Sequence, residues 1–159
     1  MILNSNTYCL LGIGGVGMSS IGKYLKLKGN EVYGYDRETT YMTKSLEKIG
    51  VKILYDDSKY LNYKSLKCSK TLIIYSSAIP KSNKMLKFYR KNGNIIKKRA
   101  VFLSEICKDF STIAIAGTHG KTTTSAILSH MFISDNKKIT AFIGGVLKNY
   151  ESNLILKGN

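Results

Sequence analysis

A glycine-rich turn near the amino terminus, Gly12-Ile13-Gly14-Gly15-Val16-Gly17, restricts the fold more than any other stretch of the chain. It follows an apolar, β-branched run over residues 7–13 and precedes a segment with Met18, Ile21 and Leu25 on one side. This change of period predicts a strand, a tight turn and a helix. Gly12, Gly14 and Gly17 match the Gly-x-Gly-x-x-Gly pattern, in which a helix start binds phosphate. The alternative is a turn that needs glycine only for close helix–strand packing.

An acidic residue closes the next predicted strand, which covers residues 31–35. Asp36 follows the last glycine of the turn at about the spacing, roughly 20 residues, at which a Rossmann unit holds a ribose hydroxyl. We therefore interpret Asp36 as a nucleotide ligand. The alternative is that Asp36 caps the helix that follows it, predicted over residues 39–49.

Strands and helices go on alternating up to about residue 106. The pattern predicts strands over 51–55, 71–75 and 94–97, helices over 82–91 and 99–110, and a loop or short helix over 56–69. Ser76 and Ser77 follow the apolar strand 71–75, and ligands of a doubly wound sheet bind outside the carboxyl ends of its strands. Their hydroxyls are candidates for holding substrate oxygens, although at least one of them could instead cap the helix over 82–91. We expect one Rossmann-like α/β domain over residues 1–106.

A second glycine-rich turn, Gly117-Thr118-His119-Gly120-Lys121-Thr122, joins a predicted short buried strand over 111–116 to a helix with an apolar face. Such a helix start binds phosphate, and here Lys121 would reach terminal phosphates while the Thr122 hydroxyl binds Mg²⁺. Only two residues separate the two glycines, where the usual phosphate loop has four, so this loop must be tighter. The alternatives are a solvated Lys121, an exposed His119, and Thr123 as an ordinary first-turn residue.

The remaining residues, 107–159, are expected to form only the start of a second domain. A strand is predicted over 139–143, and Gly144-Gly145 then opens a polar loop. Two strands and one helix cannot bury a core. We therefore interpret the sequence as the front part of something larger.

The net charge of +15 is the property that most favours another class of protein, a nucleic-acid binder. Only three of the 25 basic residues are arginine, and the basic residues are spread along the whole chain, so arginine forks that read bases are not expected. We prefer compositional drift in an AT-rich genome and expect no nucleic-acid partner. Steep salt-dependent retention on DNA would favour the alternative.

The chain has no apolar run near the ~18 residues of a membrane span, and its start lacks the layout of a secretory signal. Cys9, Cys68 and Cys107 are odd in number and far apart, which argues against a disulfide framework and a zinc site. We expect a soluble cytoplasmic protein with no membrane partner.

The two glycine loops, with Tyr75-Ser76-Ser77-Ala78-Ile79 between them, resemble those of the Mur ligases of peptidoglycan synthesis. Gly-Ile-Gly-Gly-Val-Gly-Met is most similar to the members that join L-alanine to UDP-N-acetylmuramate. The resemblance implies that Gly12, Gly14, Gly15 and Gly17 wrap the UDP pyrophosphate, with Asp36 toward the uridine. It also implies an ATP site over the residues Gly117, Thr118, His119, Gly120, Lys121, Thr122 and Thr123, with Lys121 and Thr122 acting in catalysis and Mg²⁺ on Thr122.

In the family, the γ-phosphate passes to the substrate carboxylate, and the amine of L-alanine then attacks the acyl phosphate. Lys121 and Mg²⁺ would neutralise charge on the transferring phosphoryl group. The resemblance covers the whole chain, but only the amino-terminal domain and the opening of the P-loop ATPase domain of such an enzyme. We therefore expect no ligation by this chain alone, with the carboxyl-terminal domains on another chain if a partner completes it. The alternative is a non-catalytic nucleotide-sugar-binding module or remnant.

Overall fold

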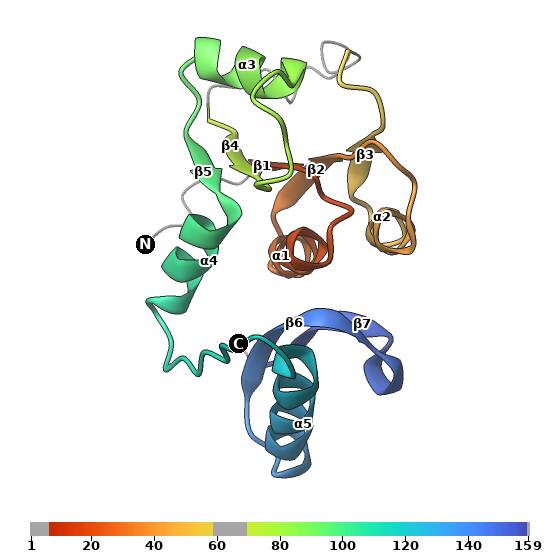
Figure 1. The fold of residues 1–159 in the computed structure, drawn as a ribbon, viewed down its shortest axis with the longest axis vertical. Coiled ribbons are helices and arrows are strands. Elements are labelled where there is room, and N and C mark those ends of the chain that lie inside the picture. Colours follow the sequence, from red (N-terminus) through yellow and green to blue (C-terminus); the bar gives the residue numbers. More distant parts are fainter. Residues whose placement is uncertain (1–6, 59–69, 159) are drawn as a thin grey trace.

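The computed structural model describes residues 7–58 and 70–158, and a five-stranded parallel sheet forms its centre (Figure 1). The strand order is β3-β2-β1-β4-β5, so the chain starts in the middle, moves to one edge and then crosses to the other. This matches the first five strands of the Rossmann order 3-2-1-4-5-6, with the switch point between β1 and β4. The predicted α/β class is confirmed. The strands are β1 Thr7–Leu11, β2 Glu31–Tyr35, β3 Lys52–Leu54, β4 Leu72–Tyr75 and β5 Ile96–Lys98.

Helices cover both faces of this sheet, as its apolar strands require. Figure 1 shows α1 (Val16–Leu27), α2 (Tyr41–Glu47) and α4 (Arg99–Cys107) on one face and α3 (Lys84–Lys91) on the other. Side chains of β1 alternate between the two layers. Tyr8 and Leu10 enter the layer of α1 and α4, and Cys9 and Leu11 enter the layer of α3.

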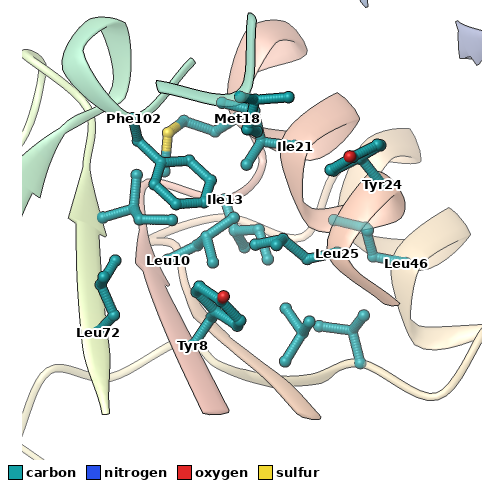
Figure 2. Close-up of a cluster of buried hydrophobic side chains, with 14 of the residues drawn as sticks. Tyr8, Leu10, Ile13, Met18, Ile21, Tyr24, Leu25, Leu46, Leu72 and Phe102 are labelled. Carbon is teal, nitrogen blue, oxygen red and sulfur yellow. The ribbon is translucent and has the colours of Figure 1, made fainter. Parts of the chain in front are cut away.

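The larger core lies between the sheet and the first helix layer (Figure 2). Tyr8 and Phe102 pack edge to face there, with ring centroids 5.9 Å apart. Ile13, from the glycine-rich turn, is fully buried in the same core beside residues of α1. The turn is therefore anchored by a core side chain as well as by its backbone.

The elements predicted up to residue 106 are all present, with ends that differ by a few residues. β5, for example, covers Ile96–Lys98 where residues 94–97 were expected. Most of the predicted loop over 56–69 lies outside the described residues. No helix within 7–58 and 70–158 is both long and apolar enough to cross a bilayer.

The second half of the chain differs from the prediction in three places. Residues 111–116 do not form a strand, and nearly all of them are exposed. Gly144 and Gly145 do not open a loop, because β6 runs through them from Ile139 to Leu147. An unpredicted strand, β7 (Ser152–Lys157), pairs antiparallel with β6 after a 3₁₀ turn over Lys148–Tyr150. Helix α5 (Lys121–Ser134) begins where the second glycine loop ends, as expected.

These differences arise from which strands and helices lie near each segment. A strand needs a neighbour to satisfy its backbone groups, and no described strand pairs with residues 111–116. β7 brings an apolar run to α1, and Leu154 joins the larger core. The β6–β7 hairpin thus lies between α1 and α5 (Figure 1), with the rings of Tyr24 and Phe142 5.4 Å apart.

Candidate functional site

The first glycine loop is fixed to the end of β2 by its backbone. The N–H groups of Gly12 and Ile13 both donate to the carbonyl oxygen of Tyr35, at 2.7 and 3.0 Å. Gly12 has φ +82°, a left-handed conformation that glycine adopts without strain. The loop therefore turns sharply at the carboxyl end of β1, and α1 begins four residues later at Val16.

Asp36 holds the same loop with its side chain. Its Oδ2 accepts a hydrogen bond of 2.7 Å from the N–H of Gly14, and its Oδ1 accepts one of 2.8 Å from the N–H of Arg37. A Cβ at position 14 would lie 2.8 Å from Asp36 Oδ2, which explains why this position requires glycine. The alternative role of Asp36 as a helix cap is wrong, because Thr40 caps α2 in a capping box with Thr43.

Ser76 lies against the first glycine of the loop. Its N–H donates to the carbonyl oxygen of Leu11 at 3.0 Å, and its Cβ would be 3.1 Å from a Cβ built on Gly12. The hydroxyl of Ser76 accepts a 3.3 Å hydrogen bond from the N–H of Ala78, and Ser77 is exposed. Neither serine caps α3, so that alternative is wrong.

The cap of α3 is Asn83, whose Oδ1 accepts a 2.9 Å hydrogen bond from the N–H of Leu86. Ser76 thus lies at the carboxyl end of β4 beside the glycine loop, and Ser77 follows it. This is the switch point of the sheet, where ligands of doubly wound folds bind.

The start of α1 offers free donors to a ligand. In the described part of the chain, the N–H groups of Val16 and Gly17 have no acceptor, and the first turn of α1 contains no acidic residue. The guanidinium of Arg99 lies directly over Gly17, so that a Cβ there would be 1.8 Å from Arg99 Nη1. Sequence reasoning missed Arg99. Its rarity was the available signal, as one of only three arginines among 25 basic residues.

The second glycine loop is tight and exposed. Gly117 has φ +145° and Gly120 has φ +77°, and α5 begins directly afterwards at Lys121. The Lys121 ammonium donates to the carbonyl oxygens of Gly117 and Thr118, at 2.5 and 2.9 Å. It therefore lies across the loop. Thr118, His119 and Thr123 are exposed around it.

Thr122 lies where α5 meets the hairpin. A Cβ on Gly144 would lie 3.1 Å from Thr122 Oγ1, and one on Gly145 would lie 3.1 Å from Thr122 Cγ2. The two glycines thus allow β6 to pass close to the first turn of α5, and this explains why they belong to a strand. The Thr122 hydroxyl stays exposed at this contact. The helices that begin at the two glycine loops, α1 and α5, both pack on the β6–β7 hairpin.

Comparison with known proteins decides the family. The model of the Mur ligase family, catalytic domain, matches residues 7–111, which hold the five-stranded sheet and its helices. The chain belongs to the Mur ligase family. Two relatives are named UDP-N-acetylmuramate–L-alanine ligase: one from Christiangramia forsetii, 40% identical over 154 residues, and one from Flavobacterium psychrophilum, 42% identical over 153. Each match covers 96% of this chain and 34% of the relative.

Solved Mur ligase structures share the fold. The UDP-N-acetylmuramate-alanine ligase of Thermotoga maritima superimposes with a TM-score of 0.86 at 31% identity, over 96% of this chain and 35% of that one. The UDP-N-acetylmuramate:L-alanyl-γ-D-glutamyl-meso-diaminopimelate ligase of Neisseria meningitides superimposes with a TM-score of 0.83 at 24% identity, over 94% and 46%. This chain spans about a third of the length of the curated relatives it matches.

Proposed function

We propose that this chain binds UDP-N-acetylmuramate as the amino-terminal part of a ligase that adds L-alanine to it with ATP, in the cytoplasmic stage of peptidoglycan synthesis. The observation that carries the proposal is the glycine loop at the β1–β4 switch point, held by Tyr35 and Asp36. Its free N–H groups at the start of α1 suit a diphosphate. Relatives about 40% identical carry the name of this activity.

The roles of the loop residues follow from their positions. Gly12, Gly14, Gly15 and Gly17 let the backbone approach the pyrophosphate, because a side chain at 14 or 17 would strike Asp36 or Arg99. Asp36 secures the loop and lies toward the uridine. Ser76 and Ser77, at the end of β4, would meet oxygens of the sugar portion.

The second loop fits the phosphates of ATP. Its two left-handed glycines and the start of a 14-residue helix form an exposed anion site, and the first turn of α5 has no acidic residue to oppose a phosphate. We assign Gly117 through Thr123 to ATP, with the Thr122 hydroxyl toward Mg²⁺. ATP would supply the phosphoryl group that activates the carboxylate. Lys121 would leave its loop carbonyls to bind the terminal phosphates and offset their charge.

Isothermal titration with UDP-N-acetylmuramate tests the first part of the proposal. We expect one site per chain, with UDP-N-acetylmuramate bound and UDP-glucose bound more weakly. The ATP site is tested separately with a fluorescent ATP analogue and Lys121→Ala, with the exposed Lys138→Ala as the control. Lack of UDP-sugar binding by the wild-type chain would overturn the proposal.

These 159 residues match about a third of the length of the relatives, which favours a non-catalytic role for this chain alone. We propose that the isolated chain binds its nucleotide sugar but does not join L-alanine to it, with residues 1–106 as the sugar-nucleotide domain and 107–159 as the start of the ATP domain. An assay of ATP-dependent formation of UDP-N-acetylmuramoyl-L-alanine by the purified chain tests this. Measurable turnover would contradict it.

A further inference from the structure

The side chain of Arg99 occupies the space above the first turn of α1. A Cβ built on Gly17 would lie 1.8 Å from Arg99 Nη1 and 3.0 Å from its Cζ. Gly17 is the second residue of α1 and Arg99 is the first residue of α4, so two distant segments place this contact. The absence of a side chain at position 17 is what admits the guanidinium.

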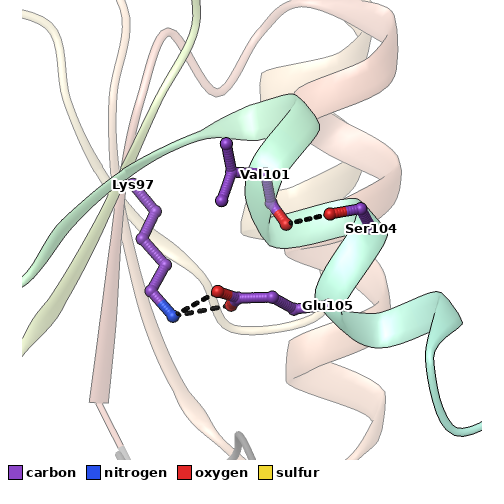
Figure 3. Close-up of polar contacts among 4 residues, drawn as sticks. All are labelled: Lys97, Val101, Ser104 and Glu105. Carbon is purple, nitrogen blue, oxygen red and sulfur yellow. Dashed lines mark hydrogen bonds and ion pairs between the residues drawn. The ribbon is translucent and has the colours of Figure 1, made fainter.

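The neighbouring charges leave this guanidinium without a counterion. In the described part of the chain, Arg99 makes no hydrogen bond or ion pair. Glu105, the acidic residue of α4, is bound by Lys97 Nζ at 2.8 and 2.6 Å, which also ties β5 to α4 (Figure 3). Asp36 is engaged by the N–H groups of Gly14 and Arg37 on the loop.

Arg99 is exposed to solvent, and its positive charge adds to that of the helix start beside it, so this place favours an anion. The amino end of a helix carries a partial positive charge, and α1 has no acid in its first turn. The free N–H groups of Val16 and Gly17 point out of the same turn. The Arg99 guanidinium and these two N–H groups are all hydrogen-bond donors with positive charge or partial charge, and they lie together. A guanidinium can bind two phosphate oxygens at once.

We propose that Arg99 binds the diphosphate of the uridine nucleotide sugar, together with the N–H groups of Val16 and Gly17. This inference rests on the proposed function, because it assigns a further ligand within the same site. It also gives Gly17 a second role, since the guanidinium needs the space that any side chain would fill.

Titration calorimetry of variants tests the assignment. Arg99→Ala should weaken the binding of UDP-N-acetylmuramate and of UDP by ~10- to 100-fold, the usual worth of a charge-assisted hydrogen bond to phosphate. Arg99→Lys should recover part of the loss, because it keeps the charge and lacks the fork. Gly17→Ala should also weaken binding, because its methyl group displaces a guanidinium that is still present. The matched control is Arg90→Ala, on the exposed surface of α3, which removes the same charge and should leave affinity within about twofold.

The outcomes separate this inference from the proposed function. Wild-type affinity in Arg99→Ala, or an equal loss in Arg90→Ala, would overturn the role of Arg99 and leave UDP-sugar binding intact. Inorganic pyrophosphate is the second probe. If the wild-type chain binds pyrophosphate in an Arg99-dependent manner but no uridine nucleotide, the diphosphate site stands and the proposed substrate falls. If it binds neither, both are wrong. Thermal unfolding of each variant shows whether a loss of affinity comes from misfolding.

Discussion

Asp36 shows how one side chain can shape a binding loop from outside it. Its two carboxylate oxygens accept hydrogen bonds from separate backbone N–H groups, Gly14 in the loop and Arg37 beyond β2. Hydrogen bonds to an ionised acceptor are about twice as strong as neutral ones. The carboxylate therefore connects the end of β2 to the turn after β1, and the turn keeps its shape before any ligand arrives.

Replacing Asp36 by Ala should lower the free energy of unfolding by ~1–2 kcal/mol, because the N–H of Gly14 loses a charged acceptor. Affinity for the nucleotide sugar should fall as well, since the loop is no longer held. Urea denaturation and titration calorimetry measure the two effects. Glu38→Ala, an exposed neighbour with the same charge, is the control. Equal behaviour of the two variants would show that Asp36 does not hold the loop.

Two buried groups behind the loop should make stability depend on alkaline pH. Burial raises the pKa of the Cys9 thiol to about 12 and that of the Tyr8 hydroxyl to about 12. In the unfolded chain these groups ionise near their ordinary values, ~8.5 and ~10. Between those values and 12 the folded state keeps protons that the unfolded state has lost, so the free energy of unfolding falls as pH rises.

Cys9→Ala isolates the thiol from the lysines that also titrate in this range. The stability difference between wild type and Cys9→Ala should be constant below pH 8 and shift in favour of the variant from pH 9 to 11. Iodoacetamide at pH 8 should label the half-buried Cys107 in the native protein and reach Cys9 only after unfolding. A pH-independent difference, or rapid native labelling of Cys9, would contradict the prediction.

At the residue scale, the sequence predicted where the glycine turn lies, but it did not predict every side chain that packs against its glycines. The Gly-x-Gly-x-x-Gly pattern correctly located the turn, because its backbone geometry depends on nearby residues alone. Which group fills the space above each glycine depends on the tertiary fold. That is why Asp36 could be found by its spacing, whereas no spacing rule connects Arg99, at the start of a helix much later in the chain, to Gly17.

Among the elements, those that pair within the first sheet were predictable and those that depend on distant partners were not. Residues 111–116 have the apolar composition of a strand but no described strand beside them. β6 continues through Gly144 and Gly145 because the first turn of α5 packs there. Glycine pairs usually end a strand, so local propensity gave the wrong answer at this contact.

The hairpin is attached to α1 by a buried amide. Asn153 is fully buried, and its Nδ2 donates to the carbonyl oxygen of Val16 at 2.6 Å and to Ser19 Oγ at 2.9 Å. Asn153→Ala should lower the free energy of unfolding by ~1–3 kcal/mol, because these acceptors stay buried without their donor. Hydrogen exchange should show the greatest loss of protection in β7.

The control for Asn153 is Asn149→Ala, in the exposed 3₁₀ turn of the same hairpin. It should leave both stability and exchange near wild type. A loss of protection spread evenly over the whole sheet would show that the amide supports the core in general. An unchanged exchange pattern would show that the hairpin is held by Leu154 and its apolar neighbours alone.

For the whole molecule, the net charge of +15 should destabilise the folded state through self-repulsion. Lys84, Lys87 and Lys91 form an exposed stripe on α3, while Met85 and Tyr89 face the core. This is the solvated arrangement expected of an ordinary amphipathic helix. Folding brings such charges closer together than they are in the unfolded chain.

Salt should therefore stabilise the protein. Raising NaCl at pH 7 from 10 mM to 150 mM shortens the screening length from ~30 Å to ~8 Å, so repulsion between separated lysines weakens. The thermal midpoint should rise by about 2–4 °C if screening recovers ~1 kcal/mol. The triple variant Lys84→Gln, Lys87→Gln, Lys91→Gln lowers the net charge by three and should melt higher at low salt, with a smaller rise on adding NaCl. If wild type and variant instead show the same salt dependence, self-repulsion does not limit stability. Tight DNA binding by wild type that the variant loses would reassign the charge to a nucleic-acid surface.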